Sequence, residues 1–159
     1  MAFRIRGLDP APFQSLYGLP ATELEKHGAV RVLAADSTGY PERVELRAAR
    51  AGESLLLINY VHQPAVGPYR SSHAVFVREG ATEPYDAIGE VPDVMRVRML
   101  SLRGFDHRGH IAEAVLVSGV ELDDAVEKLF ANEVVRYIHA HYATYGCYAA
   151  LIERHPASA

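Results

Sequence analysis

The stretch that decides the fold is VMRVRMLSLRGFDHRGHIAEAVLVS, residues 94–118. Hydrophobic and polar residues alternate along its first half, which is typical of a β-strand with one buried face. The alternation changes phase near Met99 and Leu100, and the extra residue of a β-bulge would produce such a change. Residues 106–109 have the composition of a tight turn. The stretch therefore predicts two antiparallel strands joined as a hairpin.

Four other segments predict further strands. Residues 29–35 and 73–79 alternate between hydrophobic and polar side chains. Residues 54–61 form a nearly continuous apolar run, which indicates a central strand covered on both faces. Residues 146–154 are predicted to form the last strand of the chain.

Helical patterns lie at both ends of this run of strands. Residues 10–17 predict a short helical turn, and residues 21–26 predict a second helix that ends at Gly28. From Glu121 onward the hydrophobic period changes to 3.6 residues, which predicts a helix over residues 121–131.

The segment that follows, residues 132–141, has two interpretations. Val134, Tyr137, Ile138 and His141 match the i, i+3, i+4, i+7 spacing of a helix, and we favour that interpretation. The alternative is a strand over residues 134–142 in a hairpin with residues 146–154.

Together these elements predict a single α+β domain over residues 1–155. Its sheet is mainly antiparallel, with short N-terminal helices and a C-terminal helix followed by a last strand. Residues 156–159 are small and polar enough to be a frayed tail.

The composition limits the classes of function. The chain has 159 residues, 49% of them hydrophobic, and its 16 basic and 20 acidic side chains give a net charge of −4. That charge disfavours nucleic acid as a partner. Charges near the N-terminus argue against a signal peptide, and the apolar run at residues 55–58 is too short to cross a bilayer. One cysteine excludes an internal disulfide. We expect a cytoplasmic protein of bacterial type without a membrane partner.

The loop between residues 62 and 73 is the first candidate site. It is long for a hairpin loop, and such loops tend to be functional or mobile. An arginine among tyrosine and serine hydroxyls is typical of a clamp for a carboxylate or phosphate. The alternative is that the arginine and the histidines bind loop carbonyls and hold the loop shut. The residues predicted to bind a small anionic ligand are Asn59, His62, Tyr69, Arg70 and His73.

A hydrolase or transferase that uses histidine as acid or base is the second hypothesis. A cysteine could serve as its nucleophile if an imidazole lay within hydrogen-bond reach of the thiol. A lone cysteine between glycine and tyrosine is more typical of packing. The catalytic candidates are His62, His73, His141 and Cys147.

His139 and His141 are weak candidates for metal ligands. Residues i and i+2 share a face on a strand, where both rings could reach one ion. On the favoured helix the two rings point nearly opposite ways. We therefore expect no metal site, and the sequence names no cofactor.

Four segments together resemble a known family: residues 57–64, 68–79, 137–141 and 146–150. They resemble an uncharacterised bacterial family, domain of unknown function 1203, over almost the whole chain. The resemblance implies no activity, substrate or cofactor, and it supplies no catalytic residues. A third hypothesis is an oligomeric interaction module built on exposed tyrosines and a strand edge.

Overall fold

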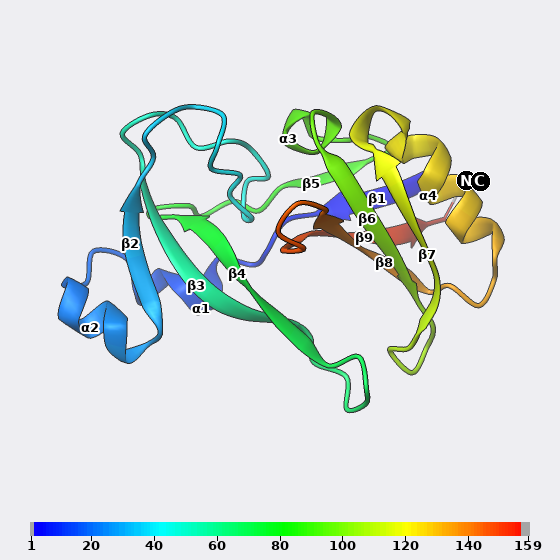
Figure 1. The fold of residues 1–159 in the computed structure, drawn as a ribbon, viewed down its shortest axis with the longest axis horizontal. Helices are drawn as coiled ribbons and strands as arrows, with labels where there is room; N and C mark the ends of the chain where they lie inside the picture. The colour runs from blue at the N-terminus through cyan, green and yellow to red at the C-terminus, as the bar shows by residue number, and fades with distance from the viewer. Residues whose placement is uncertain (1, 157–159) are drawn as a thin grey trace.

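The computed structural model describes residues 2–156, which form two antiparallel β-sheets and four short α-helices (Figure 1). The two sheets lie side by side along the long axis of the molecule. The predicted α+β class with mainly antiparallel sheets is confirmed.

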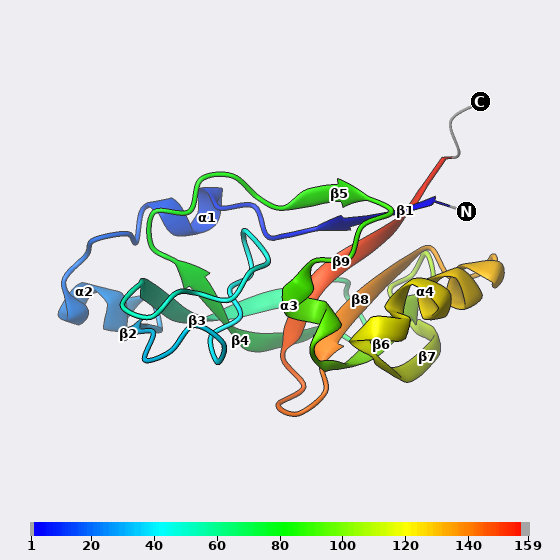
Figure 2. The ribbon, with the colours of Figure 1, turned by 90° about the horizontal axis from the view of Figure 1, so that it is seen from above.

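The larger sheet has six strands in the order β5-β1-β9-β8-β6-β7, and each neighbouring pair is antiparallel. Its strands are β1 (Ala2–Arg6), β5 (Asp86–Ile88), β6 (Met99–Phe105), β7 (Ile111–Ser118), β8 (Tyr137–Tyr142) and β9 (Tyr148–His155). Helix α4 (Leu122–Ala131) packs against the β6-β7 end of this sheet (Figure 2). Ile5, Leu102, Ile138 and Ile152 are fully buried in the hydrophobic core that forms there.

The smaller sheet has the order β2-β3-β4, with strands β2 (Ala29–Leu33), β3 (Ser54–Gln63) and β4 (Ser71–Arg78). Helices α1 (Ala11–Gln14) and α2 (Ala21–Lys26) lie beside it. The tip of the β3-β4 hairpin reaches the larger sheet. There Gln63 Nε2 donates a hydrogen bond of 2.8 Å to the Tyr137 hydroxyl, and the ring centroids of Tyr69 and His110 lie 5.8 Å apart.

The predicted hairpin exists as β6 and β7, but its first strand begins later than predicted. Residues Asp93–Arg96 form the one-turn helix α3, so the phase change near Met99 marks the passage from helix to strand. The irregular pairing lies instead between Gly104 and Phe105. The Asp106 carboxylate holds the turn by accepting hydrogen bonds from the backbone of Arg108 and His110 at 2.8 and 2.9 Å.

The favoured helix over residues 132–141 is wrong, because residues 137–142 form strand β8 between β6 and β9. Asn132 ends α4, as its side-chain oxygen accepts a hydrogen bond from the Val134 amide. Residues 138–142 of β8 are all buried, so exposure to solvent does not alternate along the strand. His139 and His141 alternate with Ile138 and Ala140, but the helical spacing of the apolar residues around them obscures this period of two.

The remaining predicted elements are present with small changes at their ends. Residues 29–35, 54–61, 73–79 and 146–154 correspond to β2, β3, β4 and β9. The helix over 121–131 corresponds to η1 (Gly119–Glu121) and α4. Strands β1 and β5 had not been predicted. The proposed tail lies outside the described residues except for Pro156, and the single domain over 1–155 stays a prediction. No helix within residues 2–156 is long and apolar enough to cross a membrane.

Candidate metal centre

Four histidines from the two sheets meet where the β3-β4 hairpin approaches β8. His62 lies near the end of β3 and His73 lies on β4. His139 and His141 lie two residues apart on β8. Because β8 is a strand, these two rings share one face of the larger sheet. All four imidazoles can therefore meet because residues 137–142 form a strand and not the predicted helix.

Three of these rings offer nitrogen atoms to a common point. One ring nitrogen each from His62, His73 and His141 lies within 4.8 Å of the other two. His62 Nε2 and His73 Nδ1 are 2.8 Å apart, which is a hydrogen-bond distance. The ring centroids of His62 and His141 are 4.9 Å apart, and those of His73 and His141 are 5.4 Å apart.

Hydrogen bonding fixes which nitrogen of His141 is available. His141 Nδ1 donates a hydrogen bond of 2.8 Å to the carbonyl oxygen of Gly146. The proton therefore sits on Nδ1, and Nε2 carries a lone pair. His141 Nε2 is buried and has no hydrogen-bond partner within residues 2–156. A backbone carbonyl that orients the far nitrogen of an imidazole is a recurrent feature of metal-binding histidines.

Burial keeps the histidines neutral. It lowers the pKa of His62 to about 4, with further lowering because a protonated His62 would be repelled by His73 and Arg103. It lowers the pKa values of His139 and His141 to about 3 and also lowers that of His73. At pH 7 these rings are therefore uncharged imidazoles, which is the form that binds metal ions.

Arg103 adds a positive charge beside the histidines. It pairs with His139 across β6 and β8, so both side chains lie on the same face of the sheet. Its Nε donates to the Ser101 hydroxyl at 3.3 Å, and no carboxylate of the described residues pairs with it. Burial lowers the pKa of its guanidinium. The site thus combines neutral imidazoles with a half-buried cation that has no acidic partner.

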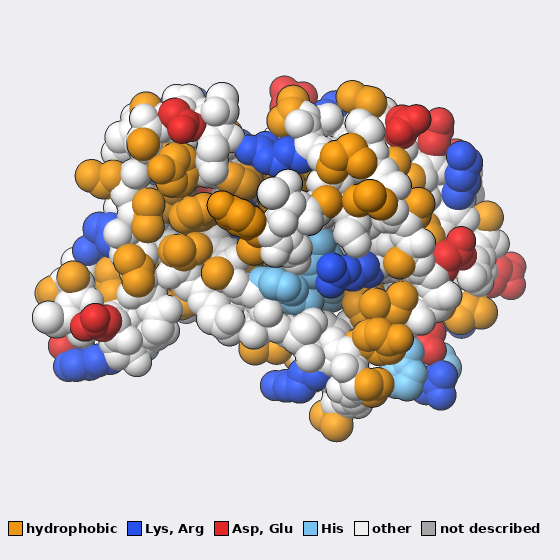
Figure 3. All heavy atoms as spheres, in the orientation of Figure 1, with side chains coloured by type: hydrophobic (Ala, Val, Ile, Leu, Met, Phe, Trp, Pro, Cys, Tyr) orange, Lys and Arg blue, Asp and Glu red, His pale blue; other side chains and the backbone are white. Residues whose placement is uncertain are grey.

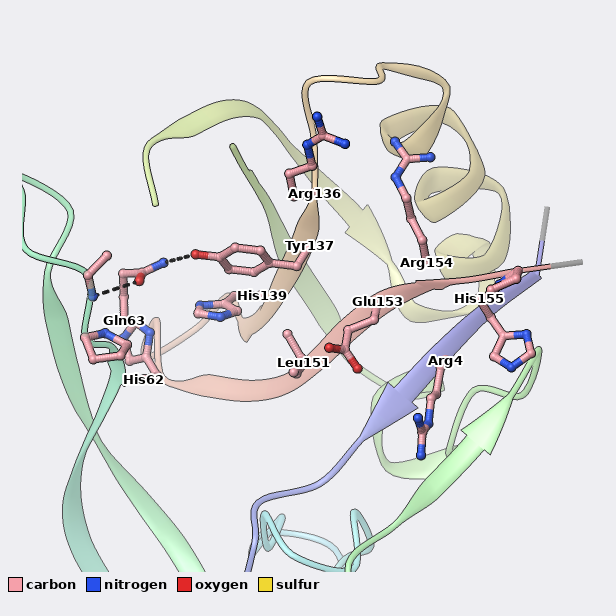
Figure 4. A pocket seen from close by; sticks show the side chains of 13 residues that line it. Arg4, His62, Gln63, Arg136, Tyr137, His139, Leu151, Glu153, Arg154 and His155 are labelled. Atoms are coloured by element: carbon pink, nitrogen blue, oxygen red, sulfur yellow. Dashed lines mark hydrogen bonds between the residues drawn. The ribbon is translucent and has the colours of Figure 1, made fainter. Parts of the chain in front are cut away.

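Parts of the histidine cluster border the surface of the molecule. In the space-filling view, histidine rings and a basic side chain line the hollow between the two sheets (Figure 3). A groove of about 950 Å³ runs along β8 and β9, with His62 and His139 at one end (Figure 4). Its polar lining is mainly basic: Arg4, Arg136, Arg154 and His155 against the single carboxylate of Glu153.

The other candidates from the sequence lie elsewhere. Arg70 is exposed, and its Nη1 donates to the carbonyl oxygen of Pro64 at 2.5 Å, which fits the alternative in which it holds the loop. Asn59 and Tyr69 are exposed. Cys147 lines a separate cavity beside Arg43. Ligand binding through Arg70 stays a prediction, and its proposed partners His62 and His73 face His141 instead.

Two residues near the histidines had no such role in the sequence interpretation. Arg103 lies on β6 beside His139, and the sequence predicts no role for it. Tyr148 stacks on His62 with ring centroids 5.2 Å apart and an angle of 10° between the rings. The register of β6 with β8 would have placed Arg103 beside His139, had β8 been recognised as a strand.

Fold and site define a class: an α+β protein in which two antiparallel sheets hold a cluster of buried, neutral histidines. The chain belongs to the family described as Protein of unknown function (DUF1203), whose family model matches residues 39–154. All four histidines of the cluster lie within the matched residues. Searches of curated proteins and of solved structures found no match.

Proposed function

We propose that this protein binds a divalent transition-metal ion, zinc in the first instance, through His62, His73 and His141. The observation that carries the proposal is the convergence of three neutral imidazole nitrogens within 4.8 Å, one of them buried without a partner. Imidazole is a ligand that suits zinc, copper, iron and nickel.

The spacing of the nitrogens supports this assignment. Zinc binds imidazole nitrogen at about 2.0–2.1 Å, so the ligands of a tetrahedral site are about 3.3 Å apart. The observed separations lie on both sides of that value, at 2.8 Å for His62 and His73 and up to 4.8 Å within the group. Small rotations of the rings would equalise them. The hydrogen bond between His62 and His73 would then be replaced by two bonds to the ion, and the shared proton would move to the far nitrogen of its ring.

Three protein ligands leave a fourth position for an exchangeable group. Sites of this kind hold water or a substrate there. Arg103 has no carboxylate partner within residues 2–156 and belongs to the same face, so we infer that a small anion occupies this position with Arg103 balancing its charge. We therefore still propose a small anionic ligand, and we assign its binding to Arg103 in place of Arg70.

A hydrolase is the second candidate, and the same open position favours it. A metal ion lowers the pKa of bound water toward neutrality and so supplies a nucleophile. This version needs no thiol, and Cys147 has no part in it. A cytoplasmic location, a bacterial source, the absence of a nucleic-acid partner and self-association stay predictions.

The anion is tested on protein loaded with Co²⁺, whose visible absorption reports its ligands. Acetate added to the wild-type protein should change this spectrum, whereas Arg103→Gln should retain Co²⁺ and bind acetate about tenfold more weakly. Arg96→Gln is the matched control, because Arg96 pairs with Asp123 at 3.4 Å on the other side of the sheet, and it should behave as wild type. Failure to bind one Co²⁺ per chain would contradict the metal site itself. An acetate response that survives in Arg103→Gln would contradict only the role of Arg103.

A further inference from the structure

A second cavity, of about 550 Å³, lies away from the histidine cluster. It is bounded by the opposite face of the β3-β4 hairpin, the segment after β2, the junction of α3 with β6, and the turn between β8 and β9. Cavities of 300–1,000 Å³ are the usual size for small-molecule sites. None of the four histidines lines it.

The walls of this cavity are apolar. Leu57, Ala74 and Phe76 form the side contributed by the smaller sheet. The exposed fractions of three large side chains at the cavity are 76% for Val97, 48% for Met99 and 89% for Tyr145. Single exposed apolar residues are common, but several around one concave surface indicate a place where a hydrocarbon is bound.

One part of the lining is cationic. The exposed fraction of Arg43 is only 3%. Its Nε donates to the Tyr148 carbonyl oxygen at 2.7 Å and its Nη1 donates to that of Pro41, while its Nη2 has no hydrogen-bond partner within residues 2–156. The guanidinium of Arg98 also lines the cavity, and no aspartate or glutamate does. The nearby Glu42 carboxylate is committed to backbone amides, among them that of Val44 at 3.0 Å.

A tyrosine between these two arginines has an unused hydroxyl. The guanidinium carbons of Arg43 and Arg98 lie 4.9 and 5.4 Å from the centroid of the Tyr142 ring. The Tyr142 hydroxyl is buried and has no hydrogen-bond partner in the described part of the chain. A buried hydroxyl without a partner costs free energy that a bound acceptor would recover.

We propose that this cavity binds a carboxylate attached to an apolar body, such as a medium-chain fatty acid or an aromatic acid. The carboxylate accepts hydrogen bonds from Arg43, Arg98 and the Tyr142 hydroxyl, because guanidinium groups match its planar geometry. The hydrocarbon lies against Leu57, Phe76 and Met99. The proposal uses none of the metal-binding residues and does not depend on the proposed function.

The test is calorimetric titration of the full chain with octanoate and with octanol, both in the presence of EDTA. EDTA removes metal, so carboxylate binding at the histidines does not contribute. We expect octanoate to bind about tenfold or more tightly than octanol, since hydrogen bonds to a charged group have an effect of this size. Equal affinities, or no binding of octanoate up to about 1 mM, would overturn the proposal.

Three variants locate the site. Arg98→Gln should weaken octanoate binding about tenfold and Tyr142→Phe about threefold, with Arg96→Gln as a control that binds as wild type. Arg98 also donates to the Thr38 and Val94 carbonyl oxygens, so loss of binding in its variant could reflect a shifted loop. Ala74→Leu avoids this difficulty, because it fills the cavity from an exposed strand position and should abolish octanoate binding in a folded protein. Unchanged octanoate affinity in Ala74→Leu would place the ligand elsewhere and overturn the proposal.

Discussion

Replacing His141 with alanine is expected to weaken zinc binding by at least about 100-fold. The side chain supplies one of three converging nitrogens, and its Nε2 is the one held in place by the hydrogen bond from Nδ1 to Gly146. Two remaining imidazoles cannot complete a site with three protein ligands. A competition titration against a chromophoric zinc chelator measures the loss, and circular dichroism confirms that the variant is folded.

Two other histidines provide the controls for this experiment. His107 is exposed in the turn between β6 and β7, so His107→Ala should bind zinc as the wild-type protein does. His139 belongs to the four-histidine cluster but not to the converging group of three, so His139→Ala should weaken zinc binding less than tenfold. Wild-type affinity in His141→Ala would exclude the proposed set of ligands.

Replacing Ile138 with alanine is expected to lower the free energy of unfolding by about 3 kcal/mol. Ile138 is fully buried in the middle of β8, where it lies between Gly104 of β6 and Ile152 of β9. Shortening it removes apolar contacts and leaves a cavity that the sheet cannot close. Denaturant unfolding of both proteins measures the difference.

Val134→Ala is the control that separates a strand from a helix over this segment. The rejected helix would bury Val134 and Ile138 on one face, whereas in the structure the exposed fraction of Val134 is 55%. We therefore expect Val134→Ala to change the free energy of unfolding by less than about 0.5 kcal/mol. Similar losses in the two variants would contradict strand β8, and with it the placement of His139 and His141.

Hydrophobic patterns and turn composition in the sequence predict the elements that have one buried and one exposed face, or that end in a distinctive turn. The β6-β7 hairpin has a turn composition that only a few conformations satisfy, and Gly109 at φ +76° fits it. Helix α4 has one apolar face against the sheet and one polar face. Strand β8 lacks that asymmetry, because the core lies on one side of it and the β3-β4 hairpin on the other. Both faces of β8 are buried by segments distant in the sequence, and local hydrophobic patterns do not predict such contacts.

The sequence predicts no metal site, and it does not predict that its histidine candidates converge. His62 and His73 are candidates because they bound a long polar loop between apolar strands, and His141 is one because of its spacing from His139 and Cys147. Their convergence depends on how one sheet approaches the other, and no spacing along the chain encodes that contact. The role of Arg103 depends on its register with His139, which could not be assigned while β8 was interpreted as a helix.

X-ray absorption at the zinc edge of the zinc-loaded protein tests the central claim most directly. The predicted spectrum has three imidazole nitrogens and one further light atom at about 2.0–2.1 Å from the metal. A shell with fewer than three imidazoles, or a Cys147 sulfur at about 2.3 Å from the zinc, would contradict the proposed centre of His62, His73 and His141.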